Sequence, residues 1–436
     1  MSSVSTVRPW QARLPFFYGW IIVALGFVAS VFSIGMTWAA GLLAVPMGGE
    51  LQWSRSAIFF AVSMRGWIGI VVTPMIGSYL DTPNGPRALA LAGGVLNTFS
   101  LALIPFVNAE WQFVMLFGVL GGIAQAAQGG ISAAIVPKWF LRQRGSAVAI
   151  STVGGALAAV FLPPILALIT HEAGWRASWG AFAIAALVLG TLPAFLLRRQ
   201  PEDLGLLPDG RPAEQTSRPS GTSRVVEPSF TRDEALHTSA FWVLLTGIAI
   251  GSLVNNGIPA SLAPIFVDHG LSFEMAASAL IWYGVASIVT KLFWGWIANR
   301  FAVRSVLLIL TLYGTFALPS LVFFPSLVGP MSYGLLSGFY IGAYFFLSQM
   351  VWADYFGRSH VGAISALGRP AGLLIGATGP FLLAFTRDLT GSYDLGILLN
   401  ALSAALCFGC LFLVRPIRRT AQATSFPLVS TPPASR

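Results

Sequence analysis

The chain has 436 residues, of which 56% are hydrophobic and only 9% are charged. A soluble globular protein carries about 25% charged residues, so this composition excludes an ordinary soluble fold and favours a bundle of membrane-spanning helices. The net charge of +9 does not indicate nucleic-acid binding, because most Lys and Arg residues lie in the two tails and in alternate loops between apolar segments. That distribution is the positive-inside pattern, which predicts that both termini are cytoplasmic.

Apolar stretches recur along the whole chain, and twelve of them are long enough to cross the hydrocarbon core, which takes about 20 residues. The first six predicted spans are 17–46, 55–80, 87–107, 111–137, 144–170 and 175–197. The second six are 239–267, 274–298, 303–325, 327–353, 360–386 and 393–414. The only long polar segment between them is rich in Pro, Ser, Thr and Arg, which is typical of a disordered linker.

These spans predict an all-α integral membrane protein built from two pseudo-symmetric six-helix bundles. The predicted divisions are a cytoplasmic N-terminal tail at 1–16, an N-terminal bundle at 17–197, a cytoplasmic linker at 198–238, a C-terminal bundle at 239–414 and a cytoplasmic C-terminal tail at 415–436.

The two bundles share short sequence matches at nearly the same offset. AISTVGG at 149–155 is echoed by AISALGR at 363–369, and WFLR at 139–142 is echoed by YFGR at 355–358. Several matches at one spacing indicate a duplicated unit. Two parallel halves with a central site between them describe a secondary transporter.

Three cations lie inside the predicted spans: Arg65, Lys291 and Arg369. A charged side chain near the bilayer centre costs roughly 2.5–3.5 kcal/mol, so such residues usually serve a function. Every Asp and Glu lies in a predicted loop or at the end of a span, which leaves the cations without an obvious internal partner. The pattern predicts binding of an anion, although each cation could instead bond helix carbonyls, and Lys291 could extend toward the interface.

Uncharged polar residues lie at similar depths in the predicted spans. The candidates for hydrogen bonding to a substrate are Asn255, Asn256, Gln128 and Tyr344. The alternative is bonding between helices, which is common for Asn and Gln in membranes. Cys407 and Cys410 have no further ligands at metal-site spacing, so we expect no metal site and no cofactor.

The chain resembles the major facilitator superfamily over essentially its whole length. The loop at 77–87 is similar to the family signature between helices two and three, and it carries Gly77, Asp81, Gly85 and Arg87. The second copy, at 295–304, retains Gly295, Arg300 and Arg304 but has Asn299 in place of the acid. In the family this loop acts as a cytoplasmic latch between halves, and the alternative is that Asp81 merely caps a helix.

Within the superfamily the resemblance is to the monocarboxylate-transporter and oxalate–formate-antiporter branch. FYGW at 17–20 and PEDLG at 201–205 are similar to bacterial members, which implies a bacterial inner membrane. Lys291 occupies the place of the family's basic residue in helix eight, and Arg369 fits the second basic residue of oxalate-type antiporters. Ser287 replaces the proton-coupling Asp of animal monocarboxylate carriers.

The sequence therefore predicts a transporter of small organic anions, mono- or dicarboxylates, that works by alternating access and exchange rather than by tight proton coupling. Its expected partners are the substrate and the lipid bilayer, with no nucleic acid and no obligatory oligomer. The alternatives are an exporter of drug-like or amphipathic compounds on the same fold and a non-transporting membrane sensor. An enzyme is not expected, because no nucleophile–base pair lies within the spans.

Overall fold

The structure is a computed structural model that describes residues 15–76, 79, 82–130, 135–140, 143–210, 232–298, 300–325, 327–356 and 361–414. Within these ranges the secondary structure is helical throughout. The predicted tails lie almost wholly outside the described residues, as does residue range 211–231 of the predicted linker.

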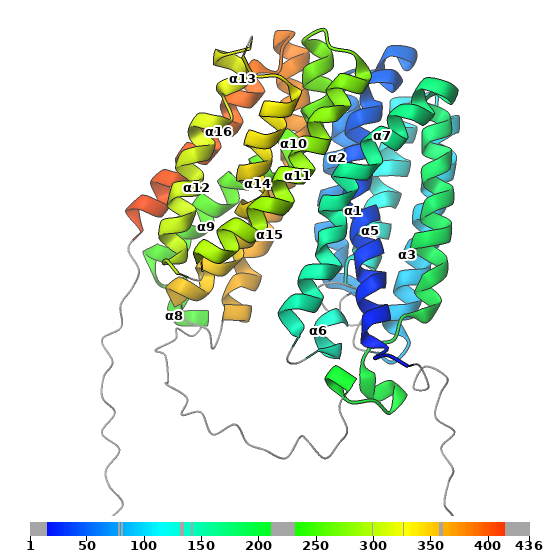
Figure 1. Ribbon diagram of the computed structural model, residues 1–436, viewed down its shortest axis with the longest axis vertical. Coiled ribbons are helices and arrows are strands. Elements are labelled where there is room, and N and C mark those ends of the chain that lie inside the picture. Colours follow the sequence, from blue (N-terminus) through cyan, green and yellow to red (C-terminus); the bar gives the residue numbers. More distant parts are fainter. Residues whose placement is uncertain are drawn as a thin grey trace, which may run out of the picture.

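The N-terminal half runs from α1 to η7 and forms one group of upright helices (Figure 1). Its elements are α1 (Gly19–Leu51), α2 (Arg55–Ile76), α3 (Gly85–Leu103), η3 (Ile104–Phe106), α4 (Glu110–Phe113), η4 (Val114–Leu120), α5 (Gly121–Gly130), α6 (Val136–Trp139), α7 (Arg144–Ala185), η6 (Ala186–Thr191) and η7 (Leu192–Leu196). The long α7 contains a break at Gly174, where φ is 80° and ψ is 170°. That conformation suits glycine, which lacks a Cβ, and it turns one helix into two adjacent crossings.

The C-terminal half runs from α9 to α16 and stands beside the first (Figure 1). Three short helices come before it: η8 (Pro201–Leu204), η9 (Pro208–Gly210) and α8 (Arg232–Leu236). Its elements are α9 (Ser239–Gly251), α10 (Leu253–Asp268), α11 (Phe273–Ala298), α12 (Val303–Ala317), α13 (Ser320–Phe323), α14 (Pro330–Phe356), α15 (Val361–Thr390) and α16 (Asp394–Leu413).

Each of the twelve predicted spans corresponds to a helix or to a run of consecutive helices. Nine helical runs in the described part of the chain are long and apolar enough to cross a membrane. One of these runs, Ser146–Leu196, contains two predicted spans, because the chain is helical directly before and after the break at Gly174. The predicted all-α class is confirmed, and the count of twelve crossings stays a prediction.

The same pattern of helix packing occurs in both halves. In the first half α1 packs against α7, α2 against η4 and α5, and α3 against η6. In the second half α10 packs against α15, α11 against α14, and α12 against α16. These pairs occupy corresponding places in the order of the six predicted spans, which is what duplication of one six-helix unit produces.

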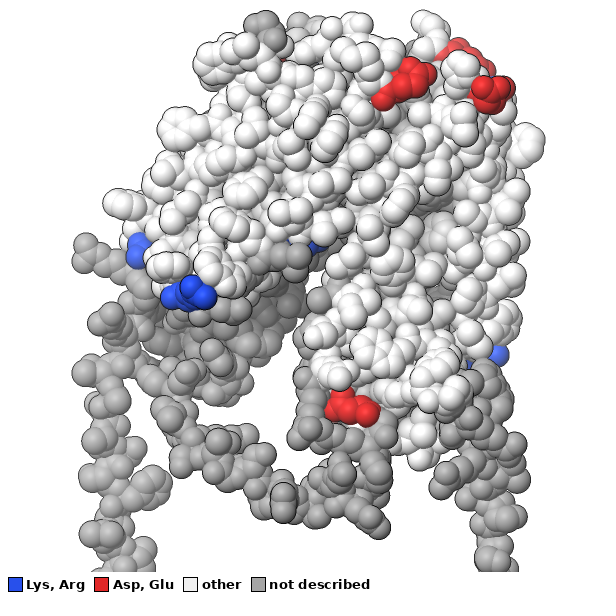
Figure 2. Space-filling view, in the orientation of Figure 1, with Lys and Arg blue, Asp and Glu red and all other residues white. Residues whose placement is uncertain are grey.

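The two halves touch along one part of their length only. Contacts join α2 to α15, α7 to α11 and α1 to α10. They lie toward the end that carries residues 50–56, 268–274 and 387–394, which we call the closed end. At the opposite end, where α6 and α8 lie, the space-filling view shows a hollow between the halves (Figures 1 and 2). We call this the open end.

The outer surface is apolar between the two ends. In Figure 2 the band between the ends carries almost no charged side chain on the visible face. Large apolar side chains are exposed to the surroundings, among them Phe106, Leu168, Phe316 and Leu413. A surface of this kind is stable against lipid and would aggregate in water, so the exposed apolar side chains identify a membrane-embedded bundle.

Small residues allow the closest approach between the halves. A Cβ added to Gly41 in α1 would overlap the backbone carbonyl of Ala260 in α10. A Cβ on Gly66 in α2 would lie 2.7 Å from the Cβ of Ala377, and one on Gly284 in α11 would lie 2.8 Å from Cγ2 of Val160. Helices that meet at glycine gain van der Waals contact along their backbones, which is how membrane helices associate without a hydrophobic driving force.

We expect Gly41→Ala to lower the thermal stability of the purified protein, because the new methyl group must push α1 away from the Ala260 carbonyl. Overpacking of this kind costs about 1–3 kcal/mol. Gly409→Ala in α16 is the matched control, since a Cβ there meets no atom within 4 Å. Thermal unfolding followed by tryptophan fluorescence measures both. An equal Tm for the two variants would show that the α1–α10 contact is looser than described.

Candidate functional site

Two of the predicted substrate residues lie on helices that join the halves, just beyond the contacts. Lys291 follows Gly284 by seven residues on α11, which is about 10 Å nearer the open end at 1.5 Å per residue. Seven residues are close to two helical turns, so Lys291 lies near the face on which Gly284 meets the N-terminal half. Arg369 precedes Ala377 by eight residues on α15, about 12 Å nearer the open end.

Lys291 is partly buried, and no acidic residue in the described part of the chain pairs with it. Its side chain forms no hydrogen bond or ion pair with any residue that the structure describes. Its neighbour Thr290 is 1% exposed, and the Thr290 hydroxyl also lacks a partner. A cation inside a membrane-spanning helix costs free energy when it is unpaired, so such a residue usually serves a function. For Arg369 the structure describes the backbone position alone.

Arg65, the third cation, is the most deeply buried of the three, with a relative exposure of 3%. Its Nε and Nη1 atoms are buried and make no hydrogen bond. The guanidinium carbon lies 5.2 Å from the centre of the Phe117 ring, an attraction of about 0.5–2 kcal/mol. A guanidinium stays charged in proteins and carries five donors, so the ring satisfies only part of what burial removed.

Arg65 lines a cavity of ≈ 110 Å³ inside the N-terminal half. Its polar lining residues are Ser30, Ser33, Arg65, Asn97, Gln125 and Gln128. They come from four helices, α1, α2, α3 and α5, and none of the lining residues belongs to the C-terminal half. We call this space the Arg65 cavity.

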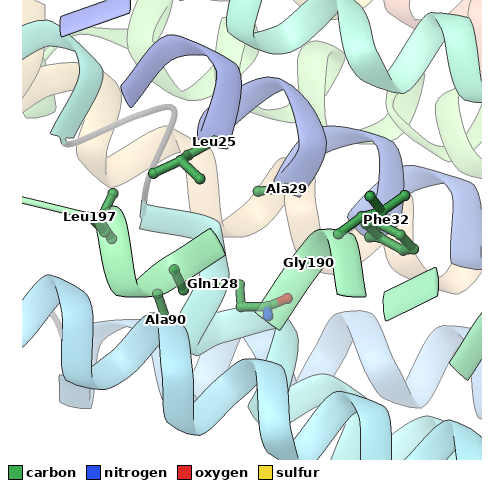
Figure 3. A pocket seen from close by; sticks show the side chains of 9 residues that line it. Leu25, Ala29, Phe32, Ala90, Gln128, Gly190 and Leu197 are labelled. Carbon is green, nitrogen blue, oxygen red and sulfur yellow. The ribbon is translucent and has the colours of Figure 1, made fainter. Parts of the chain in front are cut away.

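Gln128 lies between the Arg65 cavity and a smaller one of ≈ 20 Å³. Figure 3 shows its side chain reaching between α1, which carries Ala29 and Phe32, and the segment that carries Gly190. The smaller cavity is otherwise apolar and has room for about one water, which needs roughly 10–15 Å³. Gln128 thus lines the same larger cavity as Arg65, and its predicted contact with substrate stays a prediction.

The other uncharged candidates lie in the C-terminal half. Asn255 and Asn256 are partly exposed and follow the kink at Ser252, whose hydroxyl lies 2.6 Å from the carbonyl oxygen of Gly372 on α15. Tyr344 is 1% exposed and donates a hydrogen bond of 2.9 Å to the carbonyl of Ile248. Its hydroxyl therefore ties α14 to α9, and a role in binding substrate stays a prediction for Tyr344 and for both asparagines.

Ion pairs hold the closed end together. Asp268, at the end of α10, accepts a hydrogen bond of 2.8 Å from Nε of Arg387 and lies 3.7 Å from Nη2 of Arg55. Asp388 accepts a bond of 2.7 Å from the backbone N–H of Ser56. Because Arg55 and Ser56 belong to the N-terminal half and the three others to the C-terminal half, this network closes the bundle on one side of the cations.

Part of the predicted cytoplasmic latch lies in the described residues, and its arginines contact their own half. Arg304 donates to the carbonyls of Leu411 and Phe412 at 3.1 and 3.0 Å, which is how a cation stabilises a helix C-terminus. Arg87 lies over the Phe195 ring and Arg300 over the Trp296 ring.

The latch glycines begin or lie within helices where they are described at all. Gly85 is buried at the start of α3, and Gly295 is a backbone position in α11. Gly77 and Asp81 lie outside the described residues. A latch between halves thus stays a prediction, for an arrangement in which the open end closes.

Sequence reasoning did not single out Asn97 or Ser33, and it placed Tyr283 among the polar residues of the spans without predicting its contact with Trp38. Asn97 is 3% exposed on α3, and its Oδ1 is buried without a partner in the Arg65 cavity. Trp38 and Tyr283 meet edge to face across the halves with ring centroids 5.5 Å apart. A lone Asn in an apolar span was the only available signal for the first, and nothing in the sequence pairs the two rings. No group of three His, Cys, Asp or Glu residues in the described ranges could hold a metal ion.

A sequence profile of the Major Facilitator Superfamily matches residues 23–380, most of the chain. The chain belongs to the Major Facilitator Superfamily. The predicted resemblance is therefore confirmed, and the chain is a membrane transporter rather than an enzyme.

Relatives and solved structures agree with that assignment. Human monocarboxylate transporter 11 is 26% identical over 403 residues, covering 88% of this chain and 80% of the relative. A Bacillus subtilis protein described as an uncharacterized MFS-type transporter, YcxA, is 26% identical over 294 residues, covering 66% of this chain and 67% of that one.

Among solved structures, a D-xylose–proton symporter aligns with a TM-score of 0.70 at 14% identity, covering 91% of this chain and 97% of the other. A bacterial homologue of the human lysosomal transporter Spinster, described as inward-facing and occupied, aligns with a TM-score of 0.67 at 14% identity, covering 91% and 96%. At this identity the likeness shows the fold alone.

We expect Asp268→Asn to loosen the closed end, since it removes the carboxylate that pairs with Arg55 and Arg387. Ser63 of α2 is fully buried and accepts a hydrogen bond of 3.3 Å from the N–H of Phe381 of α15, so a cysteine at this position reports whether the α2–α15 contact opens. In a Ser63→Cys protein with Cys407 and Cys410 changed to Ala, maleimide labelling should become about fivefold faster, which corresponds to roughly 1 kcal/mol. Glu172→Gln, in an exposed pair with His171, is the control. Equal labelling rates in all three proteins would mean that the network does not hold the halves together.

Proposed function

We propose that this transporter carries small organic anions, mono- or dicarboxylates, by alternating access around a site that contains Lys291 and Arg369. One observation carries the proposal: both cations lie on helices that join the halves, each about two turns nearer the open end than a close contact between them, at Gly284 on α11 and at Ala377 on α15. Every acidic residue in the described ranges lies instead at a helix end, in a short helix or beside the break at Gly174.

The charge balance favours an anion over the alternatives. An exporter of cationic compounds would gain from a carboxylate at the depth of Lys291 and Arg369, and the described acids that join the halves, Asp268 and Asp388, lie at the closed end instead. A sensor has no evident need for unpaired cations, whose burial costs free energy. Two cations can neutralise a dicarboxylate or hold one carboxylate, in which case the Arg fork supplies two parallel hydrogen bonds. The monocarboxylate transporters among the relatives support the same class of substrate.

The lack of a central acid also bears on coupling. A proton-coupled carrier commonly uses a carboxylate that binds the proton beside the substrate. Ser287 lies on α11 one turn before Lys291, at 4% exposure, and cannot serve in that way. Exchange of anions, or facilitated diffusion, is therefore the proposed mode, in a plasma membrane with both termini on the cytoplasmic side.

The test is uptake of labelled acetate, L-lactate and oxalate into proteoliposomes, with and without internal substrate. We expect Arg369→Gln and Lys291→Gln to lower the uptake rate at least tenfold, since a charge-assisted hydrogen bond contributes about 1.5–3 kcal/mol. Arg199→Gln is the matched control, because Arg199 pairs with Asp203 at 2.9 Å near the end of the N-terminal half.

Size-exclusion chromatography would establish that each variant is folded. Faster uptake with internal substrate would support exchange. Undiminished uptake in both folded variants would remove Lys291 and Arg369 from the site, and uptake of lipophilic cations in place of carboxylates would favour the exporter.

A further inference from the structure

We infer that the Arg65 cavity is a second anion site, built wholly within the N-terminal half, and that it takes one small monocarboxylate. None of the residues that line this cavity belongs to the C-terminal half, which carries Lys291 and Arg369. That the anion held by Arg65 is of the transported class rests on the proposed function.

The Arg65 guanidinium is buried with its hydrogen-bonding capacity only partly satisfied. Arg65 has a relative exposure of 3%, and two of its three side-chain nitrogens, Nε and Nη1, are buried without an acceptor among the described residues. None of the residues lining the cavity is acidic, and the nearest compensation is the face of the Phe117 ring. Leaving a buried charge without hydrogen bonds costs several kcal/mol, whereas a bound carboxylate would accept charge-assisted bonds from those nitrogens.

Neutral hydrogen-bonding groups share the cavity wall with the cation. Asn97 and Gln128 carry amide N–H donors, and Ser33 carries a hydroxyl, all on the wall of the same cavity. Asn97 is 3% exposed, and its Oδ1 has no hydrogen-bond partner among the described residues. A carboxylate offers about four lone-pair positions and could accept from Arg65 and from these neutral donors together.

The volume and the charge of the cavity suit one small monocarboxylate. A volume of ≈ 110 Å³ gives roughly seven to eleven water-sized positions, at about 10–15 Å³ for each. A carboxylate of about two to four carbon atoms fits this space, whereas drug-sized ligands need cavities of about 300–1,000 Å³. One cation among the lining residues balances one negative charge, which favours a monocarboxylate over a dicarboxylate.

The position of the site links it to the joint between the halves. Arg65 directly precedes Gly66, where α2 approaches Ala377 of α15. An anion bound to Arg65 would therefore lie at the same height along α2 as this contact, on another face of the helix. Binding there stabilises the N-terminal half from inside, independently of any ligand between the halves.

The experiment measures Tm of the purified Lys291→Gln protein, in which the proposed central site is impaired, against rising sodium acetate at constant ionic strength. Sodium gluconate, too large for the cavity, replaces acetate as the balancing salt, and sodium chloride is tested in parallel. We expect a saturable rise in Tm with acetate, because a ligand that binds only the folded state stabilises it. Adding Arg65→Gln should weaken acetate binding about ten- to a hundredfold.

Two further variants keep the test decisive. Ser33→Leu fills the cavity while leaving Arg65 in place, and it should also abolish the acetate response; it serves if Arg65→Gln does not fold. Arg199→Gln should retain the full response. Any of three results overturns the inference. Acetate leaves the Tm of the Lys291→Gln protein unchanged, the rise in Tm persists in both cavity variants, or chloride raises Tm and acetate does not.

The outcome is separable from that of the proposed function. If no carboxylate is taken up by proteoliposomes but acetate binding depends on Arg65, the anion site stands and the transport proposal fails. If uptake depends on Lys291 and Arg369 while the acetate response ignores Arg65, the transport proposal stands and the second site fails.

Discussion

Positive charge buried without a counter-ion is the constraint on which the interior of this protein depends. Arg65 is almost inaccessible, and two of its nitrogens have no acceptor. Lys291 is partly buried and bonds to none of the described residues. In a medium of low dielectric each such charge costs several kcal/mol when it is unpaired, and the anion proposed above would offset that cost. A site that costs free energy when unliganded binds its ligand with a correspondingly larger gain.

The way the halves meet determines which side that anion can reach. Close contacts at Gly41, Gly66 and Gly284 join the helices of the two halves, and the ion pairs of Asp268 lie at the closed end of the bundle. Packing of this kind needs small residues at the crossing points, whereas the ion pairs are exchangeable with water. The two sorts of contact therefore differ in how they open. The ion pairs have partly exposed side chains that water can reach, whereas the glycine contacts are close packing between helices.

Much of the fold could be predicted from the sequence, because hydrophobic length and loop charge are local signals. The duplication was visible as short matches at one offset, and the same helix pairings recur in the structure. The break at Gly174 and the π-helical segments η4 and η6 were not predictable, since they depend on packing and not on composition. The partners of Tyr344, Arg304 and Asn97 could not be predicted either, because each lies across a helix interface that no local pattern specifies.

The claim that this interior is built for anions is tested most directly by calorimetric titration of the purified wild-type protein. The titrants are L-lactate and malonate, with ethylammonium and putrescine as cations of similar size, all at one ionic strength. The account predicts saturable heats for the carboxylates and none for the amines, because the buried charges are positive and no described acid lies among them. Saturable binding of the amines with no binding of the carboxylates would contradict it.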